Sequence, residues 1–181
     1  MLYSPLNSAK FGNSNFQIQE VPFATSLDLR INPSSKGFKI IEKTLGVKLP
    51  NKVGKTFRSK KFTILTLGPD WWLIVGANLN HEKLLRIKLE NEFYSLTDVS
   101  AQRTFVKISG KYSREVLEHG WELDLNPKIF KSGDCAQSVL ARCPVILYRG
   151  QKNDYFVYVR SSFAQHLWNF LTDASVEYLK Q

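Results

Sequence analysis

Alternation of apolar and polar residues begins near residue 26 and predicts a strand with one buried face. In residues 26–31, SLDLRI, every second side chain is leucine or isoleucine, and successive side chains of a strand point to opposite sides of the sheet. Residues 32–35, NPSS, stop the strand and offer a helix cap. Apolar side chains then recur at positions 38, 41 and 45, so we expect a helix that ends at Gly46.

Two strand-like runs after a basic stretch predict a hairpin. They are Phe62–Leu67 and Trp71–Val75, and the tripeptide Gly68-Pro69-Asp70 between them is a strong turn signal. After the hairpin, Asn80 is a candidate cap for a helix that contains leucines at positions 84, 85 and 89.

The second half of the chain repeats this order of elements. A strand around Val106–Ile108 precedes a short helix that ends at Gly120. The pair Asn126-Pro127 predicts a one-turn helix, because proline is favoured at the first helical position. Strands are expected over 135–140, 145–149 and 155–159, and a last helix begins at Ser161 or Ser162. Its apolar stripe comprises Phe163, Leu167, Phe170, Leu171, Ala174 and Tyr178.

The pattern therefore predicts an α+β fold, with mainly antiparallel sheets and packed helices in two similar βαββα-like halves. We place the first half at residues 26–95 and the second at 96–181, sharing one compact unit. Residues 1–25 are rich in Ser, Asn, Pro and Phe without a sustained period, so we expect an extended N-terminal arm.

Charge adds one regional feature. The net charge is +9, and residues 36–61 hold nine Lys or Arg against the single acid Glu42. A basic patch attracts an anionic surface, such as nucleic acid, a phosphate or an acidic protein face, and it is also typical of a solvated face. Nucleic acid is the less favoured partner, because Phe38 and Phe57 occupy core or turn positions rather than positions where bases would stack.

The sequence lacks membrane and secretion signals. No run approaches the roughly 20 apolar residues of a membrane helix. The first residues lack a basic start followed by an apolar stretch. We therefore expect a cytoplasmic protein with no membrane partner. Cys135 and Cys143 lie in apolar, strand-like stretches, which favours free buried thiols over a disulfide.

Candidate catalytic residues are few. The sequence has no dinucleotide fingerprint, P-loop or nucleophile elbow. His81, His119 and His166 stand far apart, and His119 is typical of a residue at a helix end. Asp70 and Asp98 suit turns. We therefore predict no catalytic, cofactor-binding or metal-binding residue in this chain.

The adjacent residues Trp71 and Trp72 must point to opposite faces of their strand. One can fill the core. The other is either covered within this chain or exposed as an anchor for a protein partner, and both explanations stay open. As the candidate partner interface we combine these rings with nearby basic residues: Trp71, Trp72, Arg30, Lys55, Arg58, Lys60 and Lys61.

Between Ser26 and Tyr178 the chain contains many short motifs whose order and spacing are together quite specific. The most specific are the Gly68-Pro69-Asp70 turn and the helix start at residues 160–164, RSSFA. The others are Leu29-Arg30, Gly46, Leu49-Pro50, Trp72-Leu73, Asp98-Val99-Ser100, Arg103, Ser109-Gly110, Arg114, Val116-Leu117, Gly120, Leu123-Asp124-Leu125, Pro127, Phe130, Gly133, Cys135-Ala136-Gln137 and Leu167-Trp168. Together they resemble the gamma subunit of heterotetrameric sarcosine oxidase. Trp71, Lys111 and Trp121 depart from the residues familiar in that family without undoing the match.

The resemblance implies a complex of four different subunits that oxidises sarcosine, which is N-methylglycine, to glycine. The methyl carbon would leave as formaldehyde or as methylene-tetrahydrofolate, and oxygen would become hydrogen peroxide. The resemblance further implies that FAD, FMN and NAD sit on the larger subunits and that tetrahydrofolate serves the complex. This chain would bind no cofactor and would dock on the alpha subunit, with beta and delta subunits also present.

The resemblance also implies the folate-binding, aminomethyltransferase-like fold. One branch of that fold carries a K-G-C-[FY]-x-G-Q signature. The nearest stretch here, residues 131–137 (KSGDCAQ), does not fit it, so folate binding is not carried over to this chain. Two alternative functions stay open: a free-standing small-molecule-binding protein with this fold, and a basic nucleic-acid-binding domain.

Overall fold

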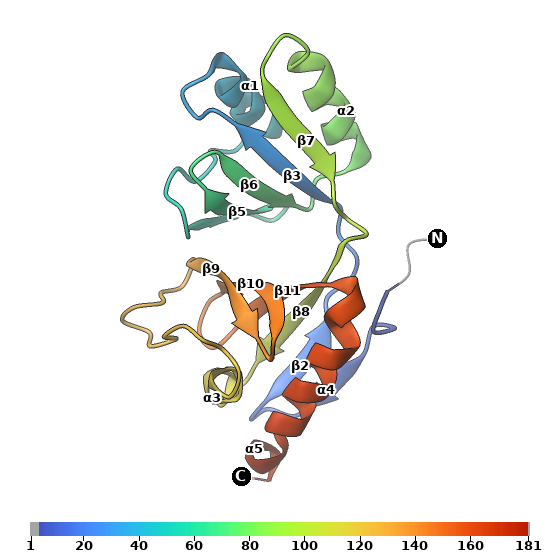
Figure 1. Ribbon diagram of the computed structural model, residues 1–181, viewed down its shortest axis with the longest axis vertical. Coiled ribbons are helices and arrows are strands. Elements are labelled where there is room, and N and C mark those ends of the chain that lie inside the picture. The colour runs from blue at the N-terminus through green and yellow to red at the C-terminus, as the bar shows by residue number, and fades with distance from the viewer. Residues whose placement is uncertain (1–3, 181) are drawn as a thin grey trace. The chain divides into compact units, whose positions relative to one another are not determined.

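The computed structural model describes residues 4–180, which divide into two compact units (Figure 1). One unit comprises residues 24–100. The other combines the residues up to 23 with those from 101 onward. Each unit consists of an antiparallel sheet with helices packed on it, so the predicted α+β class is confirmed.

The unit of residues 24–100 has a sheet in the strand order β4-β5-β6-β3-β7. Helices α1 and α2 lie side by side on one face of this sheet (Figure 1). The elements are β3 Ser26–Ile31, α1 Lys36–Leu45, β4 Thr56–Arg58, β5 Thr63–Gly68, β6 Trp71–Val75, α2 Leu79–Lys88 and β7 Tyr94–Asp98. The alternation in β3 has the expected effect, because Leu27 and Leu29 are fully buried while Arg30 is exposed.

Helix α1 has the caps that the sequence predicted. The Ser35 side chain accepts a hydrogen bond from the backbone N–H of Phe38 at 3.2 Å. Gly46 ends the helix in the left-handed conformation at φ 67°, and its N–H donates to the carbonyl of Glu42.

The start of helix α2 differs from the prediction. Its cap is Asn78, and Asn80 lies inside the helix. The reason is a capping box in which His81 takes the place usually held by Glu or Gln. The His81 N–H donates to Asn78 Oδ1 at 3.0 Å, and His81 Nδ1 accepts from the Asn78 N–H at 3.2 Å.

The other unit has the strand order β1-β2-β8-β11-β10-β9. Its elements are β1 Lys10–Gly12, β2 Gln17–Glu20, β8 Arg103–Ser109, α3 Ser113–Glu118, β9 Cys135–Leu140, β10 Cys143–Arg149, β11 Tyr155–Arg160, the 3-10 helix η1 Ser161–Phe163, α4 Ala164–Ala174 and α5 Val176–Leu179. Helices α3 and α4 contribute Val116, Leu117, Leu167 and Leu171 to the core of this unit.

Two helical predictions in this unit need correction. The last helix is interrupted at Ser175, and Phe163 lies ahead of α4 in the 3-10 helix η1, with 38% of its surface exposed. The Asn126-Pro127 signal produces a hydrogen-bonded turn rather than a helix, in which the Phe130 N–H donates to the Asn126 carbonyl at 2.9 Å.

The expected extended arm over residues 1–25 is wrong for the part that the structure describes. Strand β2 pairs with the central strand β8, with Ile18 opposite Ile108. Phe16 and Ile18 are fully buried in the core of this unit. The Glu20 carboxylate, also buried, accepts hydrogen bonds from the Ser8 N–H at 2.8 Å and from Thr104 Oγ1 at 2.7 Å. This segment is therefore a structural part of the unit.

The two units share one topology, which explains why the N-terminal segment is needed. Strands β4, β5, β6, β3 and β7 of one sheet correspond in order to β9, β10, β11, β8 and β2 of the other. The predicted similarity of the two halves therefore extends to a fifth strand in each. In one unit that strand follows the second helix as β7. In the other it comes from the N-terminus as β2. The expected boundary at residues 95 and 96 falls within β7, whereas the structure divides the chain at 100 and 101.

Candidate functional site

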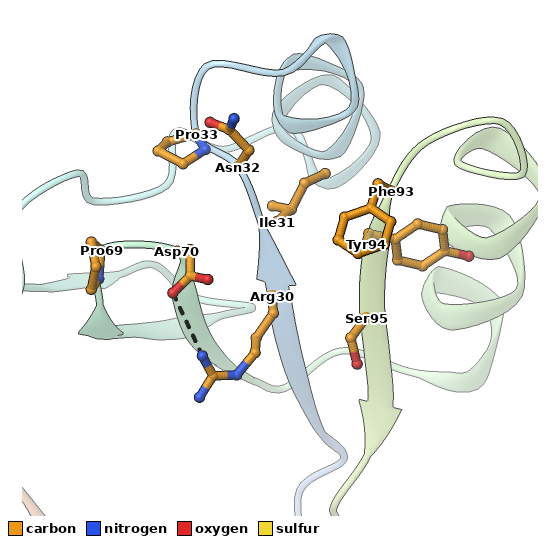
Figure 2. A pocket seen from close by; sticks show the side chains of 9 residues that line it. All are labelled: Arg30, Ile31, Asn32, Pro33, Pro69, Asp70, Phe93, Tyr94 and Ser95. Carbon is orange, nitrogen blue, oxygen red and sulfur yellow. Dashed lines mark ion pairs between the residues drawn. The ribbon is translucent and has the colours of Figure 1, made fainter.

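A pocket of about 630 Å³ lies in the unit of residues 24–100, at the end of the sheet where β3 ends and β7 begins (Figure 2). Its volume is within the range of sites that hold a small molecule or an inserted side chain. The lining residues are Arg30, Ile31, Asn32, Pro33, Pro69, Asp70, Phe93, Tyr94 and Ser95.

Arg30 supplies the positive charge of the pocket. It is opposite Trp71 in the β3–β6 pairing, and its guanidinium carbon lies 4.4 Å from the centroid of the Trp71 ring. Arg30 Nη1 is also 3.5 Å from Asp70 Oδ1, and both side chains are about half exposed, at 49% and 52%. An exposed pair of this kind contributes only about 0–1 kcal/mol. The stack on Trp71, which is worth about 0.5–1 kcal/mol at an exposed site, orients the guanidinium together with the ion pair.

Trp71 is itself held in place from below. Its indole Nε1 donates to Asp28 Oδ2 at 2.8 Å. Asp28, Arg30 and Trp71 lie on the sheet face opposite the helices, because their neighbours Leu27, Leu29 and Trp72 point into the core beneath α1 and α2. The guanidinium thus rests on a ring that is fixed by a hydrogen bond.

The backbone of the pocket is fixed by short turns. The Ile31 N–H donates to the Asp70 carbonyl at 3.0 Å and ties β3 to the β5–β6 turn. Asn32 Oδ1 accepts from the Ser34 N–H at 2.9 Å, which shapes the turn before α1. The predicted hairpin with its Gly68-Pro69-Asp70 turn is confirmed, and it carries a register irregularity between Thr66 and Gly68.

Phe93 lines the pocket next to Tyr94 (Figure 2). Its side chain is fully exposed. Ile31, beneath it, is almost completely buried. Phe93 was not among the residues predicted from the sequence. The available signal was its place between the last polar turn after α2 and the first residue of β7, where no helical or strand stripe accounts for an apolar ring.

The structure places the predicted interface residues in three different environments. Arg30 and Trp71 meet at the pocket. Trp72 does not belong to a surface, and naming it as an interface residue was wrong: only 1% is exposed, its ring lies 5.3 Å from that of Phe38, and its Nε1 donates to the Pro50 carbonyl at 2.8 Å. The prediction that the two tryptophans face opposite sides is confirmed.

The predicted basic residues Lys55, Arg58, Lys60 and Lys61 lie elsewhere. Lys55 is half-buried, and the other three are exposed around the β4–β5 turn. This turn is at the end of β5 opposite the pocket, since Thr63 begins β5 and Gly68 ends it. Along a strand of this length the two ends are roughly 17 Å apart. The seven candidates therefore do not form one cluster.

The histidines have structural contacts. His81 belongs to the cap of α2 and meets the Phe62 ring edge-on at 5.3 Å. His119 Nε2 lies 3.1 Å from the Tyr178 hydroxyl rather than at the helix carbonyls that the sequence suggested. His166 Nε2 is 3.0 Å from the Ala141 carbonyl. Asp98 accepts from the Ser100 N–H in a turn, as predicted.

Burial raises the pKa of titratable groups in the unit that contains the N-terminal segment, among them Cys143 and Tyr155. Desolvation raises the pKa of the Cys143 thiol above its ordinary value and likewise raises the pKa of the Tyr155 hydroxyl. Both effects favour the neutral form. Cys135 and Cys143 are buried and form no disulfide, as predicted.

Within residues 4–180, no group of three or more His, Cys, Asp or Glu is placed to hold a metal ion. Among the helices described, none combines the length and apolar character that crossing a bilayer requires.

Comparison with known proteins identifies the family. The model of the "Sarcosine oxidase, gamma subunit family" matches residues 34–177. The chain belongs to this family. The sarcosine oxidase subunit gamma of Corynebacterium sp. (strain P-1) is 33% identical over 169 residues, covering 91% of this chain and 82% of the relative. The subunit gamma of an Arthrobacter species is 32% identical over 165 residues, covering 89% and 80%.

Solved structures agree with the family assignment and with the fold. A chain of the heterotetrameric sarcosine oxidase from Corynebacterium sp. U-96, in complex with pyrrole 2-carboxylate, matches with a TM-score of 0.89 and 29% identity, covering 97% of this chain and 95% of that chain. Aminomethyltransferase T of the glycine cleavage system from Bartonella henselae matches with a TM-score of 0.60 and 10% identity, covering 84% of this chain and 44% of that chain. The expected aminomethyltransferase-like fold is therefore confirmed.

Proposed function

We propose that this chain is the gamma subunit of a heterotetrameric sarcosine oxidase and that its role is structural rather than catalytic. The observation that carries the proposal is the near-complete correspondence with a gamma subunit, at 33% identity over 91% of this chain and 82% of the relative. The match to a chain of a solved heterotetramer, over 97% of this chain, supports it.

A structural role is supported by how the polar side chains of the chain are used. His81, His119 and His166 have contacts with a helix cap, a tyrosine hydroxyl and a turn carbonyl. The buried Glu20 holds the N-terminal segment against β8. Acid–base catalysis needs positioned groups that face a substrate site with separated pKa values. These residues instead stabilise the fold.

In this proposal the chemistry takes place on companion subunits, where FAD, FMN and NAD bind. Sarcosine is oxidised to glycine in the cytoplasm while oxygen is reduced to hydrogen peroxide, and the methyl carbon leaves as formaldehyde or as methylene-tetrahydrofolate. This chain docks directly on the large alpha subunit, and the beta and delta subunits complete the complex. Tetrahydrofolate is not assigned to this chain, because 10% identity with aminomethyltransferase T carries the fold and no ligand.

The proposal is tested by co-expressing the tagged chain with the three companion subunits encoded in the same genome. We expect the companions to co-elute with the chain and the eluate to contain flavin and to oxidise sarcosine, whereas the chain purified alone has neither property. A chain that elutes alone from the mixture would contradict the proposal, as would sarcosine turnover by the chain without its companions.

A further inference from the structure

We propose that the pocket beside Arg30 is a docking site for a segment of a companion subunit, in which an apolar side chain next to an acidic one enters the pocket. The inference rests on the proposed function and adds the contact face and the chemistry of its occupant. Three observations support it. The Phe93 ring is fully exposed, the Arg30 guanidinium is preorganised by its stack on Trp71, and the unit of residues 24–100 has an excess of positive charge.

The exposed ring of Phe93 favours a polypeptide over a small molecule. Phe93 is fully exposed although it lines the pocket. A ligand seated on Ile31 inside the pocket would leave the outer face of the ring in water. A polypeptide that crosses the pocket covers this face as well, and aromatic rings buried in this manner are typical interface anchors.

The position of Arg30 favours a carboxylate on the incoming segment. Its guanidinium is stacked 4.4 Å from the Trp71 ring centroid, so little side-chain entropy is lost when a second acceptor binds. Asp70 neutralises it only in part, because the two groups are 3.5 Å apart and half exposed. Since Arg presents five donors, it can bind a new carboxylate while it keeps this contact.

The charge of the surrounding unit points to the same partner. Residues 24–100 contain thirteen Lys or Arg and seven Asp or Glu. Lys36, exposed at the start of α1, is three positions after the pocket residue Pro33. The nearby acid Glu92 is directed to the start of α1, because a Cβ on Gly37 would meet its carboxylate at 3.0 Å. An acidic segment is thus attracted to this unit as a whole, and Arg30 and Lys36 are the basic residues at or beside the pocket itself.

The walls of the pocket suit an inserted side chain. Pro33 and Pro69 have fixed φ angles, and the Ile31–Asp70 backbone hydrogen bond ties two of the walls together. A pocket that changes little on binding loses little free energy to ordering. The pocket also borders the edge of the sheet, because Ser95 belongs to the edge strand β7 and pairs with Arg30.

The test compares variants of the tagged chain in binding to the companion subunits, measured by co-elution and by surface binding at increasing salt. Phe93→Ala should weaken association about ten- to a hundredfold. Arg30→Gln should weaken it about thirtyfold or more and reduce its salt dependence. The matched control is Ile87→Ala, which removes an exposed side chain of α2 outside the pocket and should stay within about twofold of wild type.

A photo-crosslinking benzoylphenylalanine in place of Phe93 identifies the partner segment in the assembled complex. We expect a crosslinked peptide of a companion subunit that contains Asp or Glu next to an apolar residue. Unchanged binding of both pocket variants would overturn the inference, as would a crosslinked peptide without an acidic residue, and the proposed function would stand in either case. If the wild-type chain itself fails to bind the companions, the proposed function is wrong and the docking site falls with it.

Discussion

The adjacent tryptophans of β6 allow a sharp comparison, because one neighbour is in the core and the other is at the pocket. Trp72→Ala removes a ring that is 1% exposed, packs 5.3 Å from Phe38 and donates to the Pro50 carbonyl at 2.8 Å. Trp71→Ala removes a half-buried ring that donates to Asp28 and supports Arg30.

The two alanine substitutions should lower the free energy of unfolding by clearly different amounts. Replacing a buried Trp by Ala typically costs about 3–5 kcal/mol, and we expect Trp72→Ala to fall in that range. Trp71→Ala loses a cation–π contact of about 0.5–1 kcal/mol and one hydrogen bond of about 1 kcal/mol, so about 1.5–2 kcal/mol in all. Trp72→Phe should cost only about 1–2 kcal/mol, since the Pro50 carbonyl keeps its bond from Thr66 at 2.9 Å.

The assay is hydrogen exchange of the isolated chain, read on the amides of β3 and β6, together with urea unfolding followed by circular dichroism. Exchange reports the unit of residues 24–100 separately from the other unit. Equal costs for the two alanine variants, or a larger cost for Trp71→Ala, would show that the assignment of faces in this sheet is wrong.

Three further predictions concern the unit that contains the N-terminal segment, with Gly46 of the other unit as a comparison. Gly110→Ala should cost more than about 2 kcal/mol in urea unfolding, because Gly110 has φ 116° and a Cβ would lie 2.5 Å from a backbone carbonyl, whereas Gly46→Ala should cost only about 1 kcal/mol, since φ is 67° and the space is open. A smaller cost at Gly110 than at Gly46 would contradict this. Glu20→Ala leaves the buried Leu6 N–H and Thr104 hydroxyl without their acceptor and should lower stability by about 3 kcal/mol in the same assay, and a loss below about 1 kcal/mol would refute the network. Burial raises the pKa of the Cys143 thiol above 9.0, so the stability that depends on its protonated form is fully present below about pH 9 and is lost as pH rises through the folded-state pKa. Urea midpoints measured at rising pH should fall less steeply above that pH in Cys143→Ala, and an identical fall would disprove the contribution.

Elements with strong local signals could be predicted from the sequence. Strand β3 has a clear alternation, and helix α1 has both its Ser35 cap and its Gly46 stop. The β5–β6 hairpin has a turn whose residues determine its place. In each case the information lies within about ten residues, so no knowledge of the tertiary structure is needed.

Strand β2 could not be predicted by the same reasoning. It has four residues, and only Ile18 among them is apolar, so the alternation is limited to Phe16 and Ile18. Its stability comes from pairing with β8, where Ile18 meets Ile108, and from Glu20, which binds Thr104. Such long-range contacts leave little local periodicity. Without knowledge of the pairing with β8, the segment is interpreted as an extended arm.

The candidate site was only partly predictable for a related reason. Strand parity required Trp71 and Trp72 to face opposite sides, but the identity of the buried one depends on Phe38 in α1. Arg58 and Lys61 are close in sequence to the pocket residue Asp70 but lie far from the pocket. The reason is that the chain runs the full length of β5 between them. The role of Phe93 becomes visible only in the structure, where it lines the pocket.

Native mass spectrometry of the co-expressed complex tests directly whether this chain is a structural subunit that binds no cofactor. The account predicts one assembly that contains a single copy of this 20.8 kDa chain together with the companion subunits, and it predicts that the chain released from the complex carries no flavin, nicotinamide or folate mass. A released chain that retains a cofactor, or an intact and active sarcosine oxidase that lacks this chain when all subunits are present, would contradict it.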